Sequence, residues 1–239
     1  MNRPYPKILF ACTSFLLLSF APISKPVSTN AKNKSPYSSF TKKSSKVLYD
    51  SLKLQNYGLS EKAFEYAYKG YERLENKGSL RNPDLLTICD FTKSSSEKRM
   101  YVIDVFNHKL LVNTYVAHGK NSGTQYAKNF SNKEKSLASS LGFFVTRNIY
   151  VGKHGLSLRL DGLEPGFNDN AKKRAVVIHG AGYIGEHQLH SQFMGRSFGC
   201  PAVPQEEAPK IIDLIKNGTC LFIYHPSASY LHGSKILNG

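Results

Sequence analysis

The sequence predicts a mainly β domain preceded by a short helical segment. Apolar runs of strand length alternate with turn residues throughout the second half of the chain, and no long helices alternate with them. The aromatic residues are 14 Tyr and 14 Phe, a composition that favours strands. This pattern argues against a doubly wound parallel sheet, in which strands and helices alternate.

The N-terminal residues 1–24 are expected to be a secretory signal peptide. The positive start MNRPYPK is followed by an apolar run of about 16 residues, ILFACTSFLLLSFAPI. A membrane span needs about 20 such residues, so an uncleaved anchor is the alternative interpretation. We therefore expect an exported protein of the periplasm or cell envelope, with membrane contact only if this segment stays attached. Residues 25–44, rich in Ser, Lys, Asn and Pro, are expected to form a flexible linker.

The charge predicts an anionic partner. The 239 residues carry 32 basic and 17 acidic side chains, a formal net charge of +15. The basic residues are scattered in short groups such as Lys172-Lys173-Arg174, with no basic helix and no nucleic-acid motif. Nucleic acid is therefore not an expected partner. An exported protein of this charge is expected to meet an envelope polymer or surface instead.

Residues 45–83 are predicted to be a helical segment. A first helix over about 45–56 stops at Asn56-Tyr57-Gly58, and a second begins after Ser60, a favourable N-cap, and closes at Gly78. The second helix carries an apolar stripe at helical spacing: Phe64, Ala67, Tyr68, Tyr71 and Leu74. We interpret this stripe as a packing face against the main domain; a docking face for a partner is the alternative.

Residues 84–239 are predicted to form the main β domain. The expected strands are LLTICDF, RMYVIDVF, KLLVNTYVAHG, LGFFVTRNIYVG, LSLRLDGL, RAVVIHG and TCLFIYH, with hairpin turns at SSSEK and FNHK. One short helix is expected within residues 205–218, where four apolar residues share a face and Gly218 ends the pattern.

The cysteines differ in their surroundings. Cys12 leaves with the signal, which leaves an odd number in an oxidising compartment and suggests a free thiol. Cys89 and Cys220 lie in strand-like apolar runs and are expected to be buried core residues; a disulfide between them is the alternative. Cys200, in GRSFGCPAV, lies between Gly199 and Pro201, a turn setting typical of a cysteine that reacts or binds.

His179 is the candidate partner of Cys200. It is expected to close the strand AVVIHG at a sheet edge, and the loop-like stretch after it, before Cys200, is long enough to return the thiol to its side. A free thiol has a pKa of about 8.5, so an adjacent imidazole that takes its proton creates a nucleophile for carbonyl carbon. The N–H groups of Gly199 and Cys200 are expected to stabilise the oxyanion, and Arg196 to bind a substrate carboxylate.

These residues resemble the L,D-transpeptidase (YkuD-like) catalytic domain, whose pattern is His-Gly on a strand and, after a loop, Ser/Thr-X-Gly-Cys. The matches are His179-Gly180 and Ser197-Phe198-Gly199-Cys200, together with GKNSG at 119–123 and SSLGFFVT at 139–146. The likeness covers about residues 85–225 and is nearest to a branch with GRSxGCPA, NSG and GxNDNA, here GFNDNA at 166–171.

Two positions depart from the common family form. That form has His before the Gly-Cys, where this chain has Phe198, and Arg two residues after the Cys, where this chain has Ala202. Arg196 is a candidate to supply the missing charge. The departures concern substrate details more than the chemistry of Cys200 and His179.

The resemblance implies an L,D-transpeptidase-like β-sandwich or barrel, with a short helix after the cysteine and no metal or cofactor. It implies a peptidoglycan L,D-transpeptidase in which Cys200 cleaves the diamino acid–D-Ala bond of a tetrapeptide stem and passes the acyl group to an amine of a second stem or of a protein lysine. Water as acceptor makes an L,D-carboxypeptidase. The residues expected to bind substrate or oxyanion are Gly199, Ser197, Arg196, Gly180, Tyr183, Asn168 and Asn170, although Asn168 and Asn170 fit a simple turn equally well.

Three other functions were weighed. His187 and His190, beside Glu186, would make a zinc site with Cys200, but neither an HExxH nor a CxxC spacing is present. A papain-type peptidase has its cysteine before its histidine, the reverse of the order here. A non-catalytic cell-wall-binding module needs the basic surface but not the thiol, so fast reaction of Cys200 with a thiol reagent would count against it.

Overall fold

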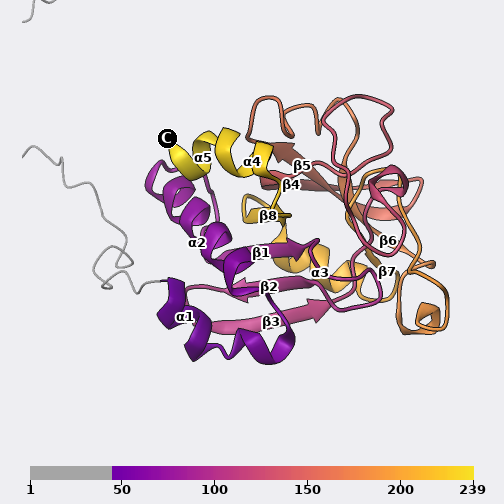
Figure 1. The fold of residues 1–239 in the computed structure, drawn as a ribbon, viewed down its shortest axis with the longest axis horizontal. Coiled ribbons are helices and arrows are strands. Elements are labelled where there is room, and N and C mark those ends of the chain that lie inside the picture. Colours follow the sequence, from indigo (N-terminus) through magenta and orange to yellow (C-terminus); the bar gives the residue numbers. More distant parts are fainter. Residues whose placement is uncertain (1–44) are drawn as a thin grey trace, which may run out of the picture. The chain divides into compact units, whose positions relative to one another are not determined.

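A computed structural model describes residues 45–239 of the chain, so the predicted signal and linker lie outside the described residues. Eight strands form one sheet (Figure 1). Their bounds are β1 Leu85–Asp90, β2 Met100–Asp104, β3 Lys109–Thr114, β4 Gly142–Gly152, β5 Gly155–Gly162, β6 Val177–Ala181, β7 Ala202–Pro204 and β8 Cys220–Tyr224.

The sheet is mostly antiparallel and nearly closes on itself. The strand order is β3-β2-β1-β8-β4-β5-β6-β7, with parallel pairing only between β1 and β8 and between β6 and β7. A single antiparallel bridge joins Ala117, just after β3, to Ala202 of β7. The two ends of the sheet are thus brought together at this point, so the sheet nearly closes. The predicted mainly β class is confirmed.

Few helices accompany the sheet in the described residues. They are α1 Ser45–Ser51, α2 Glu61–Asn76, α3 Ala208–Ile215, α4 Ala228–Gly233 and α5 Lys235–Asn238, with short 3₁₀ turns at η2 Leu54–Tyr57, η3 Lys120–Ser122 and η4 Glu186–Gln188. The Ser60 side chain accepts the Ala63 N–H at 3.2 Å, so the predicted N-cap of α2 is confirmed. The first predicted helix is interrupted, because Lys53 takes a left-handed conformation between α1 and η2. None of the described helices is long and apolar enough to cross a membrane.

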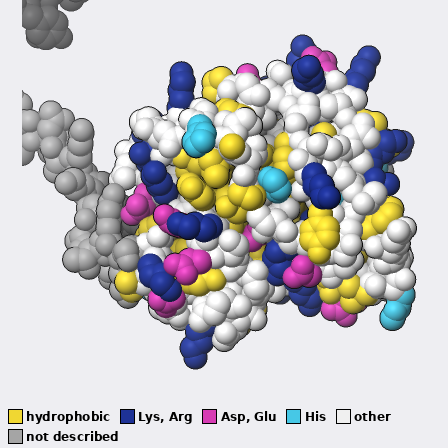
Figure 2. All heavy atoms as spheres, viewed as in Figure 1, with side chains coloured by type: hydrophobic (Ala, Val, Ile, Leu, Met, Phe, Trp, Pro, Cys, Tyr) yellow, Lys and Arg dark blue, Asp and Glu magenta, His cyan; other side chains and the backbone are white. Residues whose placement is uncertain are grey.

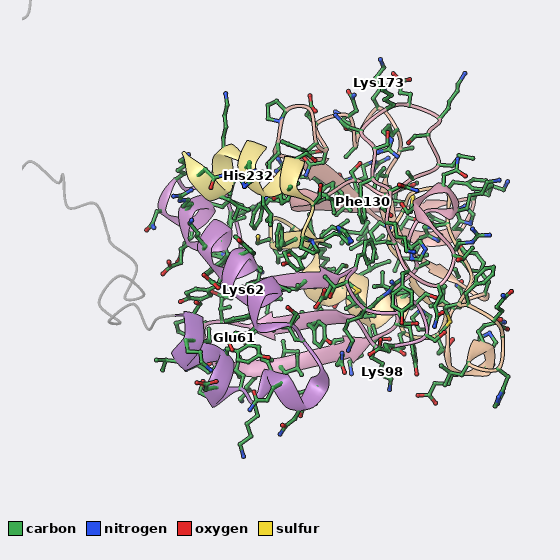
Figure 3. All side chains as sticks on the ribbon, viewed as in Figure 1. Glu61, Lys62, Lys98, Phe130, Lys173 and His232 are labelled. Atoms are coloured by element: carbon green, nitrogen blue, oxygen red, sulfur yellow. The ribbon has the colours of Figure 1, made fainter. Side chains whose placement is uncertain are left out.

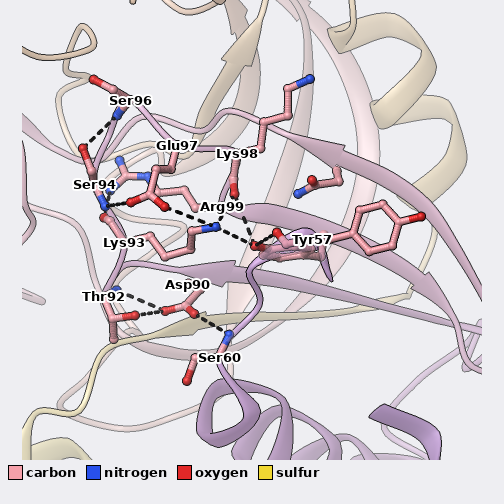
Figure 4. Close-up of polar contacts among 12 residues, drawn as sticks. Tyr57, Ser60, Asp90, Thr92, Lys93, Ser94, Ser96, Glu97, Lys98 and Arg99 are labelled. Carbon is pink, nitrogen blue, oxygen red and sulfur yellow. Dashed lines mark hydrogen bonds and ion pairs between the residues drawn. The ribbon is translucent and has the colours of Figure 1, made fainter. Parts of the chain in front are cut away.

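The helical segment packs into the core of the β domain. The buried side chains of α2, including Phe64, Tyr71 and Leu74, belong to the same apolar cluster as those of β1, β4 and β8. The stripe is therefore a packing face, as predicted. Figure 4 shows the polar joint at the start of α2: the buried Asp90 carboxylate accepts the Ser60 N–H at 3.2 Å and the Thr92 hydroxyl at 2.5 Å.

Gly70 lets α2 lie close against the sheet. A Cβ built at this position would lie 1.9 Å from Cζ of Phe143, a fully buried ring of β4 that stacks on Phe222 of β8. We predict that Gly70→Ala destabilises the fold by about 1–3 kcal/mol, because overpacking outweighs the gain in helix propensity of about 1 kcal/mol. Urea denaturation measures this, with the exposed Lys69→Ala as control; a Gly70→Ala midpoint equal to that of the wild type contradicts it.

Most predicted strands lie where expected, with three differences. KLLVNTYVAHG forms a strand only to Thr114, because the backbone after it turns toward β7. The strand β7 and the helices α4 and α5 were not predicted, since none exceeds six residues. His179 is the middle residue of β6, not its last, and β6 is an inner strand rather than a sheet edge.

The remaining cysteines and the surface charge agree with expectation. Cys89 of β1 and Cys220 of β8 are fully buried free thiols, so the disulfide alternative is wrong. Lys and Arg side chains are spread over the visible face rather than gathered in one patch (Figure 2).

Candidate active site

Cys200 is the last residue of a tight turn built by Ser197. The Ser197 hydroxyl donates to the Cys200 carbonyl at 2.5 Å and accepts the Gly199 N–H at 3.0 Å. Gly199 has φ +121°, and a Cβ there would lie 2.9 Å from the Ala138 carbonyl oxygen. Glycine is thus required for both conformation and space.

This turn changes the expected oxyanion donors. Because the Gly199 N–H is bonded within the turn, it does not point at a substrate in this structure. The Cys200 N–H makes no hydrogen bond within residues 45–239 and is the donor that remains. A backbone N–H beside the nucleophile is suitably placed for the oxygen of a tetrahedral intermediate.

The Cys200 thiol lies beside the start of β6, just before the point where β7 begins to pair with that strand. Its Sγ lies 3.7 Å from the Ala175 carbonyl oxygen and also meets the Val177 N–H. In the parallel register His179 lies opposite Ala202, so Cys200, two residues earlier, is level with Val177. Cys200 and His179 are therefore diagonal neighbours, although no hydrogen bond joins their side chains in the described part of the chain.

His179 is held in one tautomer. The residue is 3% exposed, and its Nδ1 lies 2.8 Å from the Gly180 carbonyl oxygen. A carbonyl only accepts, so Nδ1 carries the hydrogen and Nε2 is left as the basic nitrogen. A backbone carbonyl thus orients this imidazole, a detail that sequence cannot show.

A second histidine, which the sequence did not single out, covers the first. His154, in the turn between β4 and β5, stacks on His179 with ring centroids 4.4 Å apart and an interplanar angle of 22°. Burial lowers the pKa of His179, the bond to Gly180 opposes that change, and the charge of His154 lowers the pKa further. The β4–β5 hairpin therefore contributes directly to the site.

We predict that His154→Ala raises the pKa of His179. The substitution removes a neighbouring positive charge and also exposes the ring to water, and both changes favour the protonated imidazole. Titration of the His179 ring by NMR measures the shift. The exposed His190→Ala is the matched control and should leave it unchanged; an unchanged or lower pKa in His154→Ala contradicts the prediction.

Arg174 is the cation whose charge acts on the Cys200 thiol. Its two terminal nitrogens donate to the Ser131 carbonyl at 2.7 Å, the Ala138 carbonyl at 2.6 Å and the hydroxyls of Ser136 and Ser140. Lys173 instead points outward at the upper edge of Figure 3, paired with Glu134. Arg174 thus ties two loops together beneath the turn. Burial raises the pKa of the Cys200 thiol, while the Val177 N–H and the Arg174 charge oppose that rise.

Arg196 is engaged by backbone. One terminal nitrogen donates to the carbonyls of Lys120 and Gly123, at 2.9 and 3.0 Å, and the guanidinium stacks on Phe193. Arg196 therefore holds the GKNSG segment, residues 119–123, in place through its backbone carbonyls. His118, whose pKa burial lowers to about 4, contacts the same Gly123 carbonyl from Nε2 and is held at Nδ1 by the buried Arg99.

The other predicted residues occupy different places. Asn168 is fully buried, and its amide is bonded to the Glu164 N–H and the carbonyls of Leu141 and Phe143, so it shapes its loop and has no surface that a substrate could meet. Asn170 likewise binds the backbone of Asn132. Tyr183 is 37% exposed. The pKa of its hydroxyl is raised mainly by partial burial and, to a smaller extent, by the charge of the nearby Cys200 thiolate.

Two other sequence-based expectations concern Gly180 and the alternative zinc site of His187 and His190. A Cβ at Gly180 would lie 2.9 Å from Oε1 of Gln205. The His187 ring binds the Gly182 carbonyl at 2.8 Å. Within residues 45–239, no three His, Cys, Asp or Glu side chains are grouped to hold a metal ion.

Comparisons with known proteins give one family match and remote structural similarities. A family model described as the L,D-transpeptidase catalytic domain matches residues 55–224. The chain is similar to solved L,D-transpeptidases from Mycobacterium smegmatis (13% identity, TM-score 0.37, 59% of each chain covered) and Enterococcus faecium (14%, 0.37, 59% of this chain and 50% of that one). It thus spans about three-fifths of the first and half of the second. No curated protein matches.

Proposed function

Because the chain belongs to the L,D-transpeptidase catalytic domain family, we propose that it is a peptidoglycan L,D-transpeptidase with Cys200 as nucleophile and His179 as base. One observation carries this proposal. A half-buried thiol lies at the edge of the strand that holds a buried imidazole whose Nε2 is free to accept a proton. The substrate of such an enzyme, peptidoglycan, lies outside the cytoplasm, which agrees with the export expected from residues 1–24.

The first half-reaction forms a thioester. The Cys200 sulfur attacks the carbonyl carbon of the diamino acid at stem position three, and its proton passes to Nε2 of His179. The Cys200 N–H stabilises the oxyanion. The carbon–nitrogen bond then breaks, His179 returns the proton to the leaving amine, and D-Ala departs.

The second half-reaction transfers the acyl group. An amine of a second stem attacks the thioester, His179 takes its proton, and the Cys200 thiolate leaves and is reprotonated. A protein lysine would follow the same path. Water in place of the amine gives an L,D-carboxypeptidase, which needs no change in these residues. No described side chain distinguishes these acceptors.

The resting pair is expected to be neutral. Burial raises the pKa of the Cys200 thiol and lowers the pKa of His179, so both directions disfavour an ion pair, contrary to the sequence-based expectation. We predict that alkylation of Cys200 by iodoacetamide accelerates steadily from pH 6 to pH 9, since only the thiolate reacts. A rate that is already maximal near pH 6 would show an ion pair and contradict this.

The decisive experiment uses residues 25–239 and purified muropeptides with tetrapeptide stems, with products followed by mass spectrometry. Loss of D-Ala together with cross-linked dimers is the expected result. Loss of D-Ala without dimers would identify a carboxypeptidase. No reaction would reject the catalytic proposal for this substrate and favour a wall-binding module.

A further inference from the structure

A basic groove adjoins the candidate nucleophile and has no role in the proposed bond-making steps. Its volume is about 490 Å³, and it is lined by Arg81, Arg147, Arg159 and Lys172 together with Tyr150 and Asp161. Ala175 and Val177 also line it, and these two residues supply the carbonyl and the N–H that meet the Cys200 sulfur. The groove therefore shares two residues with the surroundings of the thiol, although Cys200 itself does not line it.

The strand register places one of these arginines level with the thiol. Arg159 of β5 lies opposite Val177 of β6, and Cys200 lies level with Val177 on the other side. Adjacent strands are about 4.8 Å apart, so the Arg159 backbone lies about 10 Å across the sheet from that of Cys200. Arg159 pairs with Val177, and His179 is two residues after Val177 on β6. Arg159 and His179 therefore lie on the same face of the sheet.

The groove carries excess positive charge. Asp161 pairs with Arg147 at 2.6 Å, which neutralises one of the four cations. Cζ of Arg159 lies 4.2 Å from the centroid of the Tyr150 ring, so the guanidinium packs against an aromatic side chain within the groove. Within residues 45–239, Arg81, Arg159 and Lys172 form no ion pair with an acidic side chain. A guanidinium without an acidic partner offers two parallel N–H groups that match a carboxylate.

We propose that this groove, with Arg159 at its centre, binds a free carboxylate of the acyl-donor stem peptide. The inference rests on the proposed function. The carboxylate of the departing D-Ala is only three bonds from the attacked carbon, so it stays near Cys200 and does not extend to Arg159. Two others lie six or seven bonds away: the second carboxylate of a diaminodicarboxylic acid at position three, and the free carboxylate of a side-chain-linked glutamate at position two. They reach about 7–8 Å from the attacked carbon, taking about 3.3–3.6 Å for each three bonds.

The experiment compares Arg159→Gln with the wild type on synthetic tetrapeptides that are unmodified, amidated at position two or amidated on the position-three side chain. We expect Arg159→Gln to raise KM about tenfold with little change in kcat, as for loss of a charge-assisted hydrogen bond. Amidation of the carboxylate that the groove binds should also raise the wild-type KM about tenfold, as for loss of a charge-assisted hydrogen bond, and should leave the KM of Arg159→Gln unchanged. The position at which amidation has this effect identifies which of the two carboxylates the groove binds.

Controls separate binding from folding and from chemistry. Lys210→Gln, an exposed charge on α3, should leave KM unchanged, and the Cys200 alkylation rate of Arg159→Gln should equal that of the wild type. If neither amidation raises KM more in the wild type than in Arg159→Gln, the groove proposal is wrong.

A second readout does not depend on turnover. Calorimetry of the same peptides with Cys200→Ala should show about tenfold weaker binding when the recognised carboxylate is amidated, and no such difference in Cys200→Ala/Arg159→Gln. Equal binding of all three peptides would overturn the inference. If the wild type releases no D-Ala but this difference is present, the proposed reaction fails and the groove proposal stands.

Discussion

Cys200→Ala is expected to abolish D-Ala release, with a fall in kcat/KM of at least about a thousandfold, because no other described side chain can form the thioester. The two remaining described thiols are unsuitable. Cys89 and Cys220 are fully buried, and burial raises the pKa of Cys89 to about 12 and that of Cys220 further. Mass spectrometry of muropeptide products measures the loss.

The same variant gives a test that needs no substrate. Native protein spanning residues 25–239 should take up one equivalent of iodoacetamide, and Cys200→Ala should take up none. Cys200→Ser preserves the turn, because the backbone groups that Ser197 binds are unchanged, and should be as inactive as Cys200→Ala. Release of D-Ala by Cys200→Ala at even a tenth of the wild-type rate would remove Cys200 from the mechanism.

His179→Gln is expected to lower kcat by about 10²–10⁴-fold, the usual contribution of a positioned general base. Glutamine fills the space between β6 and the His154 ring but has no basic nitrogen to accept the thiol proton. Steady-state kinetics on tetrapeptide stems measures the loss, and KM should change little.

Its controls identify which imidazole acts. The exposed His190→Ala should retain wild-type kcat, and thermal unfolding should establish that His179→Gln remains folded. If His179→Gln retains full activity while His154→Ala loses it, the base is His154 and the assignment to His179 is wrong.

Much of the architecture was predictable because its signals are local. Ser60 caps α2 through a contact three residues away, and the strand runs around Cys89 and Cys220 are continuous apolar stretches. The elements that escaped prediction are short and depend on distant partners. For β7, three residues become a strand because they pair with His179, Gly180 and Ala181. The break at Lys53 likewise has no clear sequence signal.

The candidate site divides in the same way. Cys200 and His179 were singled out from the sequence because a glycine turn surrounds the first and a strand holds the second. Arg174 and His154 were not, because what makes them important is proximity to residues 26 and 25 positions away in the chain. Arg196 was expected to meet substrate, but its guanidinium is held by the Lys120 and Gly123 carbonyls.

The amino-acid sequence alone determined the β class, the amphipathic helix that packs on it, and a thiol in a glycine turn, since each follows from the spacing of neighbouring residues. Tertiary structure alone decided that the Gly199 N–H is bonded within its turn, which nitrogen of His179 is basic, and that Arg159 is level with Cys200. The reason is physical: hydrogen-bond partners, burial and strand register arise from long-range pairing, and these set the charge and orientation of each group.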